Sequence, residues 1–146
     1  MAPRGEPPSA PGFREIDHSG DIGIEAWGAD LAALLENATM GLFGLVRRGR
    51  VESGVERPIR VSSASAEDLL VDWLGEVISL SGIHGEVYGS VRIDRSGEWF
   101  AEGVLAGERA DAAKHDFRFD VKAATYHKLA VEKKGDGYHG RVVFDL

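Results

Sequence analysis

The spacing of apolar residues changes once along this chain, and the change predicts the order of its secondary structure. Apolar residues recur at three- and four-residue intervals over 31–46 and again over 69–78. From Glu86 onward the period is two, as in strands with one buried face. Two helices followed by a run of hairpin strands are typical of an α+β domain. We therefore predict two helices packed on a mostly antiparallel β-sheet in a single domain.

Capping residues predict where the two helices begin and end. Asp30 stands at an N-cap position, and the apolar stripe after it continues to about Val46. Ser65 and Asp68 form an S-x-x-D start signal for the second helix. Gly82 is the expected stop of that helix.

Short apolar runs and turn residues predict the strands. The step His18–Asp21 separates the first two strands, and Lys134–Gly137 forms a hairpin turn near the end. The expected strands cover 13–17, 22–27, 57–61, 86–93, 99–106, 117–121, 127–131 and 138–144.

Length and composition limit the domain organisation. The chain has 146 residues, of which 43% are hydrophobic and 28% charged, as in ordinary globular domains. Four of its five prolines lie in residues 1–12, which predicts a disordered tail before a domain over 13–146. No apolar run approaches the roughly 18 residues of a membrane span, and no secretory leader is visible. We expect a cytoplasmic protein that does not act at a membrane.

Charge and cysteine content exclude several classes of site. The 17 Lys and Arg face 24 Asp and Glu, a formal charge of −7, which disfavours a stand-alone nucleic-acid binder. The chain has no Cys, so disulfides, thiolate metal sites and a Cys nucleophile are excluded. A P-loop, a Rossmann turn, a G-x-S-x-G elbow and HExxH are all absent from the sequence. Ser19 beside His18 is a weak signal for a hydrolase, since sequence neighbours rarely face one another productively.

Two acidic segments could hold a metal ion. Asp17 and Asp21 flank a polar step between apolar strands, and Asp145 precedes the final residue, Leu146. Anionic oxygens gathered at a strand tip suit Ca²⁺, Mg²⁺ or Mn²⁺. The alternative is a turn in which Asp21 binds backbone N–H groups, together with a solvated chain end.

Other charged segments allow two interpretations. Lys122–His127 places Lys, Thr, Tyr and His within six positions, and a lysine at a strand end can hold an anion or balance carboxylates. It can equally be a solvated residue. Glu108 and His115 belong to a charged stretch between strands, and most such stretches are solvated faces.

Four blocks in order resemble the archease family, whose members are accessory to RtcB-type tRNA-splicing ligases. The resemblance runs from Phe13 to Leu146. Ser19, Gly20 and Leu146 stand where the family usually has Thr, Ala and Ile. The blocks are DHSGDIGI with AWG (17–24 and 26–28), DLLVDWL (68–74), KAATYH (122–127) and VFDL (143–146).

The resemblance implies a divalent metal site formed by Asp21, Asp145 and the main-chain oxygens of Leu146, with Ca²⁺, Mg²⁺ or Mn²⁺ as the ion. It implies no catalytic residue in this chain. It also suggests a functional surface that includes Lys122. The further candidates for that surface are His18, Glu108 and His115.

By the same resemblance, the expected function is activation of an RtcB-type RNA ligase. The activator promotes guanylylation of the ligase and multiple turnover, and it meets tRNA only through the ligase. One alternative is a metal-dependent phosphoester hydrolase with His18 as general base. Another is a metal-independent chaperone or binding module for an RNA-modifying enzyme. Its natural RNA-facing patch would be Arg47, Arg48, Arg50, Arg57 and Arg60.

Overall fold

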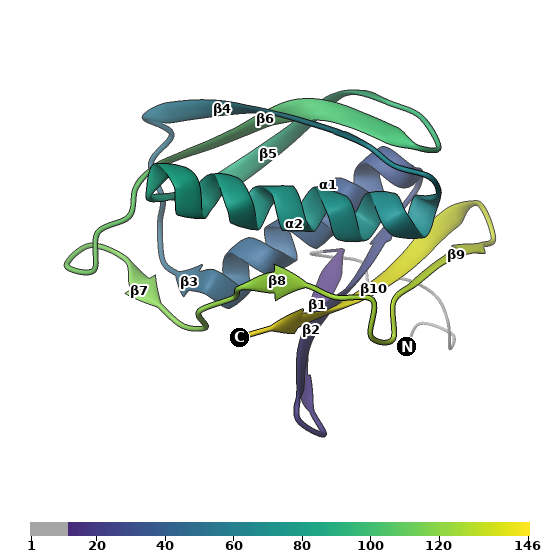
Figure 1. Cartoon of the computed structure of the whole chain (residues 1–146), viewed down its shortest axis with the longest axis horizontal. Coiled ribbons are helices and arrows are strands. Elements are labelled where there is room, and N and C mark those ends of the chain that lie inside the picture. Colours follow the sequence, from purple (N-terminus) through teal and green to yellow (C-terminus); the bar gives the residue numbers. More distant parts are fainter. Residues whose placement is uncertain (1–11) are drawn as a thin grey trace.

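The computed structural model describes residues 12–146, and in this range two helices lie between two antiparallel sheets (Figure 1). The predicted α+β class with two helices and antiparallel strands is confirmed. The expected single sheet is divided in two, because helix α1 (Leu31–Val46) packs against both strand β2 (Asp21–Gly28) and strand β5 (Glu86–Ser96). Apolar residues on more than one helix face are thereby buried.

The larger sheet brings both ends of the domain together. Its order is β1 (Phe13–His18), β2, then β10 (Gly137–Asp145), with β8 (Ala123–Ala124) and β9 (Ala130–Lys134) both paired to β10. The last strand in the sequence thus lies beside the first hairpin.

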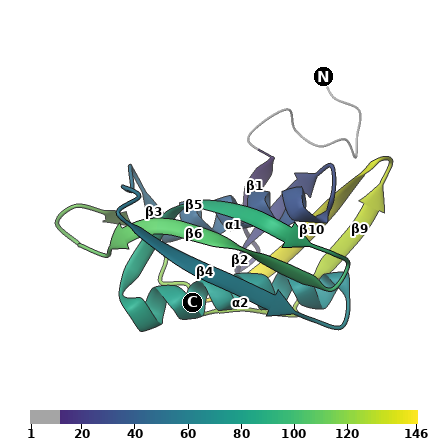
Figure 2. The same ribbon diagram turned by 90° about the horizontal axis from the view of Figure 1, so that it is seen from above.

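The second sheet covers the other side of the helices. Its order is β4 (Val55–Ser62), β6 (Phe100–Arg109) and β5, and Figure 2 shows these strands running over the helical layer. A separate two-stranded pair joins β3 (Arg47–Arg48) to β7 (Asp116–Phe117).

The predicted N-caps are confirmed. Oδ1 of Asp30 accepts a hydrogen bond from the N–H of Ala33 at 2.8 Å, which begins α1. Oγ of Ser65 accepts one from the N–H of Asp68 at 3.1 Å, which begins α2 (Ala66–His84). Both helices start where sequence-local chemistry predicted.

The core between the sheets is mostly apolar, and the polar groups of Trp73 and Thr39 within it are hydrogen-bonded. Trp73 is completely buried, and its Nε1–H donates to Oγ1 of Thr39 at 2.9 Å. The Thr39 hydroxyl donates in turn to the carbonyl of Leu35 at 2.6 Å. The buried indole N–H therefore has an acceptor, as burial requires.

The predicted end of the second helix was wrong. The helix continues through Gly82 to His84 and ends at Gly85, whose φ of 64° gives the left-handed C-cap. Gly82 keeps helical geometry because one glycine inside a helix is tolerated when a better stop follows.

One predicted strand is shorter than expected, and another is shifted along the chain. Only Phe117 of 117–121 lies in a strand, because Arg118 and Phe119 donate their backbone N–H groups to the carbonyls of Val46 and Leu45 at the end of α1. The strand predicted over 127–131 begins at Ala130, after a turn.

The predicted tail over residues 1–12 falls mostly outside the described residues. Gly12 itself is placed, and its carbonyl accepts the N–H of Trp27 at 2.8 Å. Neither of the helices found within 12–146 has the length and apolar character needed to cross a membrane.

Candidate functional site

Strand β2 begins with a carboxylate, Asp21, and the neighbouring strand β10 ends with one, Asp145. The register of β2 and β10 pairs Phe144 with Ile22, and Asp145 and Asp21 are the next residues beyond that pair. Phe144 and Ile22 pack on the core, so alternation assigns both aspartates to the opposite face of the sheet. The strand register thus places two predicted ligands, far apart in sequence, at the same end of the β2–β10 pair.

A tight turn fixes the position of Asp21. Ser19 and Gly20 have φ values of 56° and 83°, as a two-residue type I′ hairpin turn requires. The strands on either side pair His18 with Asp21. Ser19 therefore occupies the exposed tip of a hairpin, which gives no support to its role as a nucleophile.

The side chains of Lys128 and His127 lie close to the carboxylate of Asp21. Nζ of Lys128 donates to its Oδ2 at 2.8 Å, while Nε2 of His127 lies 3.7 Å from Oδ1, beyond hydrogen-bond distance. The hydrogen bond from Lys128 lowers the pKa of Asp21, burial opposes this, and the charges of Lys128, His127 and His18 add to the lowering. Asp21 is thus an ionised carboxylate, and one of its oxygens accepts no hydrogen bond from residues 12–146.

The KAATYH segment lies along the end of β10. The N–H of Lys122 donates to the carbonyl of Asp145 at 2.8 Å, and Oγ1 of Thr125 donates to the carbonyl of Val143 at 2.8 Å. The Lys122 ammonium is paired with Asp120, not with Asp145. Backbone and side-chain hydrogen bonds to the carbonyls of β10 therefore place the motif beside the candidate ligands.

The donor set at this end of the sheet is small. Within 12–146 the structure contains no cluster of three or more His, Asp or Glu side chains suited to a metal ion. The predicted metal ligands include only two side chains, Asp21 and Asp145. The remaining predicted ligands are the main-chain oxygens of Leu146, a half-exposed residue. Such hard oxygen donors fit Ca²⁺, Mg²⁺ or Mn²⁺, and the ammonium on Asp21 shows that the site attracts positive charge. The metal site stays a prediction.

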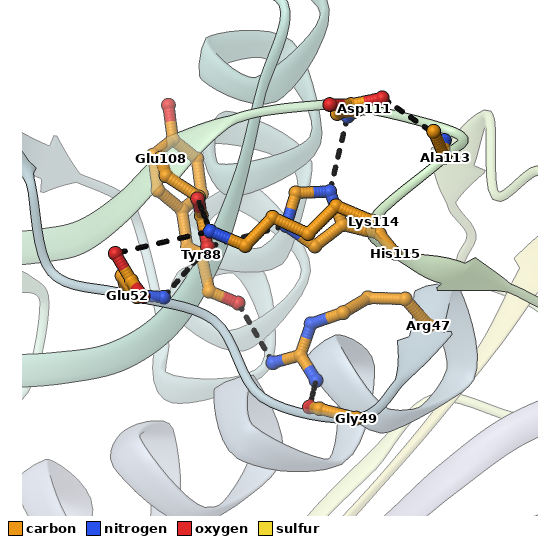
Figure 3. Close-up of polar contacts among 9 residues, drawn as sticks. All are labelled: Arg47, Gly49, Glu52, Tyr88, Glu108, Asp111, Ala113, Lys114 and His115. Atoms are coloured by element: carbon orange, nitrogen blue, oxygen red, sulfur yellow. Dashed lines mark hydrogen bonds and ion pairs between the residues drawn. The ribbon is translucent and has the colours of Figure 1, made fainter.

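Glu108 and His115 meet in a different cluster (Figure 3). Glu108 accepts hydrogen bonds from Nζ of Lys114 and, at 2.7 Å, from the N–H of Glu52. The Lys114 bond, followed by that of Glu52, lowers the pKa of Glu108 to about 2 against the effect of burial. This carboxylate joins three chain segments, at Glu52, Glu108 and Lys114.

His115 does not lie on the surface as expected. Its side chain is fully buried, and its Nδ1 accepts the N–H of Asp111 at 3.0 Å. Nδ1 therefore carries no proton, and the Nε2 proton faces Oε2 of Glu108 at 3.2 Å. This second contact lacks hydrogen-bond geometry, so the attraction is electrostatic. No hydrogen bond or ion pair within 12–146 joins this cluster to Asp21 or Asp145.

The arginine-rich segment is not one exposed patch. Arg47 is buried, and its guanidinium donates to the carbonyls of Gly49 and Tyr88, while burial lowers its pKa. Arg57 donates two hydrogen bonds of 2.8 Å to the carboxylate of Glu86. Arg60, although exposed, also forms an ion pair with Glu102 at 3.3 Å, so three of the five arginines proposed for an RNA-facing patch make contacts within the chain.

Sequence reasoning missed Lys128. No motif marks this residue, and its contact with Asp21 spans 107 positions in the chain. Its only local signal is its place directly after KAATYH. The pairing of strands, rather than any pattern, brings its ammonium to Asp21.

Comparison with known proteins gives consistent results. The sequence model of the archease protein family (MTH1598/TM1083) matches residues 13–146. The archease of Methanosarcina acetivorans is 32% identical over 139 residues, which cover 92% of this chain and 95% of that protein. The archease of Pyrococcus furiosus is 34% identical over 129 residues, covering 86% and 91%.

Two solved structures share the fold. The solution structure of Methanobacterium thermoautotrophicum protein 1598 has a TM-score of 0.76 and 30% identity, covering 92% of this chain and 99% of that one. The crystal structure of a Thermotoga maritima archease, described as a possible chaperone, has a TM-score of 0.65 and 25% identity, covering 91% and 96%.

Proposed function

This chain belongs to the archease family, and from that membership we propose that it activates an RtcB-type RNA ligase and is not itself a catalyst. The resemblance implies that the protein helps the ligase to take up guanylate from GTP and to turn over repeatedly in tRNA splicing and RNA repair. The ligase joins the RNA ends. A cytoplasmic location stays part of this proposal.

One observation carries the proposal beyond family membership. The register of β2 and β10 puts Asp21 and Asp145 at the same end of the sheet, followed directly by Leu146. These residues would hold a divalent cation through hard oxygen donors. When bound, such an ion supplies positive charge that can neutralise phosphate oxygens at the ligase. Asp21 and Asp145 would orient it, and KAATYH would support the end of β10.

Charge supports contact with RNA through the ligase. The chain has a formal charge of −7, which suits docking on a basic, RNA-binding enzyme better than direct binding of RNA. Lys122, 61% exposed in its side chain, remains accessible for an acidic group or a phosphate of the partner complex. Its role in activation stays a prediction.

The decisive measurement is the amount of ligated RNA formed per ligase molecule, with GTP and Mn²⁺ present. Wild-type protein is expected to raise this number above one, and Asp145→Asn is expected to lower the activation at least about tenfold, since even changes around metal ligands cost that much. Asp136→Asn removes the same charge from the exposed β9–β10 turn and should leave activation intact.

The ligation assay and a separate hydrolysis assay distinguish the rival functions. Ligation unchanged by the wild-type protein would contradict the activator role. Activation that survives Asp145→Asn would instead favour a metal-independent binding module. Hydrolysis of a phosphoester by the isolated protein, lost in Asp21→Ala, would favour the hydrolase.

A further inference from the structure

Lys128 has a backbone conformation that its residue type disfavours. Its φ is 55°, and among residues 12–146 only Ser19 is another non-glycine residue with positive φ. Ser19 belongs to the two-residue hairpin turn, which needs such angles. Lys128 is the third residue of the four-residue turn Tyr126–Leu129, a position where a positive φ is usually taken by Gly or Asn, so a lysine is strained there.

Two hydrogen bonds fasten this segment to strand β10, and a third closes its turn. Nε of Arg141 donates to the carbonyl of Lys128 at 2.8 Å, and the N–H of Leu129 donates to the carbonyl of Tyr126 at 3.2 Å. The N–H of Thr125 donates to β10 at 3.0 Å. The backbone of the turn over 125–129 is therefore held against β10. From this backbone the side chain of Lys128 extends to Asp21.

The Lys128 ammonium lies on a predicted metal ligand. It contacts Oδ2 of Asp21 at 2.8 Å, and Nε2 of His127, from the same turn, lies 3.7 Å from Oδ1. The Lys128 side chain is 50% exposed, so the ammonium can leave for solvent without disturbing packed atoms. Asp21, by contrast, is 17% exposed and fixed at the start of β2.

We propose that Lys128 is an internal competitor of the divalent cation at Asp21, so that the cation displaces the ammonium when it binds. This inference rests on the proposed metal site. An ammonium and a divalent ion on one carboxylate repel each other strongly at such short range. Lys128 thereby weakens divalent binding. When the cation binds, the turn over 125–129 loses its ion pair with Asp21.

Calorimetric titration of the full chain with Mn²⁺ and with Ca²⁺ tests the proposal. Lys128→Met keeps the length of the side chain and removes its charge, and it should tighten binding about two- to five-fold, the range of an exposed ion pair. Lys128→Arg keeps the charge and should bind like the wild type. Lys134→Met is the matched control, because it removes a lysine from an exposed pair with Glu132 on β9.

A second readout uses the wild-type protein. In the ¹⁵N NMR spectrum of the lysine ammonium groups, the Lys128 signal should lose its hydrogen-bonded character as Ca²⁺ is added. A signal that persists at saturation would overturn the proposal. This measurement needs no variant and is independent of ligase activity.

The outcomes separate this inference from the proposed function. If the wild type binds Mn²⁺, Asp21→Asn abolishes binding and Lys128→Met leaves it unchanged or weaker, the metal site stands and the competitor role is refuted. If neither the wild type nor Lys128→Met binds either ion, the metal site is refuted, and the competitor role with it.

Discussion

The carboxylates of Glu108 and Asp21 both accept a hydrogen bond from a lysine, but only Glu108 is surrounded by further donors of its own chain. The two side chains are equally exposed, at 17% each, so burial does not distinguish them. Glu108 also binds the N–H of Glu52 and faces His115. At Asp21 the second group is His127, whose Nε2 lies 3.7 Å from Oδ1, beyond hydrogen-bond distance.

The difference concerns what each carboxylate can still bind. A carboxylate offers about four acceptor positions. At Glu108 one hydrogen bond reaches each oxygen, and Nε2 of His115 lies against Oε2. Its contacts join chain segments, so its role is to hold the fold. Asp21 keeps an oxygen without a hydrogen bond and has a lysine that can leave. The open carboxylate at the strand end is therefore the one suited to an external cation.

The largest expected effect is on the stability of the closed cluster. His115→Ala should lower the free energy of unfolding by about 2 kcal/mol, because it opens a cavity and leaves the N–H of Asp111 without an acceptor. His127→Ala, at the open cluster, should change it by less than about 0.5 kcal/mol, since that side chain is 59% exposed. Urea unfolding of both variants checks this. Equal losses would remove the distinction between the clusters.

A smaller effect is expected in the pH dependence of stability. The folded-state pKa of Glu108 is about 2, below its ordinary value of 4.5. Because the pKa is lowered, the stabilisation is full above about pH 4.5 and is lost as pH falls toward 2. The wild type should thus be more stable than Glu108→Gln at pH 7, with a difference that shrinks steadily below pH 4.5. A difference independent of pH between 7 and 3 would contradict the donor arrangement around Glu108.

The smallest effect should have the opposite sign. Lys128→Asn should raise the free energy of unfolding by about 0.5 kcal/mol, because asparagine tolerates positive φ better than lysine. Lys114→Asn removes a lysine from the closed cluster, where no such strain exists, and should not stabilise. Thermal unfolding of the two variants in parallel measures the contrast. A destabilised Lys128→Asn would show that the ion pair with Asp21 outweighs the backbone strain.

Local chemistry allowed much of the fold to be predicted. Asp30 and Ser65 cap the two helices because each supplies an oxygen to an N–H three residues away. The turn around Gly135 follows equally from neighbouring residues. The helix was predicted to end at Gly82, but Gly85 is the better local stop. The strand predicted over 117–121 is short because a longer-range interaction takes its backbone N–H groups. The carbonyls at the end of α1, for example, take the N–H groups of Arg118 and Phe119.

The candidate site was less accessible to local reasoning. The residues alone left Asp21 between a turn role and a ligand role, and the family resemblance favoured the ligand role. For Glu108 and His115 the sequence indicated a charged stretch, but not that His115 would be buried. Burial depends on which elements pack together. The periodic spacing of apolar residues predicts burial of apolar side chains, but it does not predict burial of a polar residue such as His115.

The sequence by itself determined the two helices, their caps, the hairpin turns and the supply of hard oxygen donors, because each depends on residues a few positions apart. Only the tertiary structure decided that β10 lies between β2 and β8, that Asp145 therefore follows the same strand pair as Asp21, and that Lys128 reaches Asp21 across 107 positions. The physical reason is that strand pairing is non-local. Its register is set by burying one face of each strand against the helices, and many remote residues contribute to that burial.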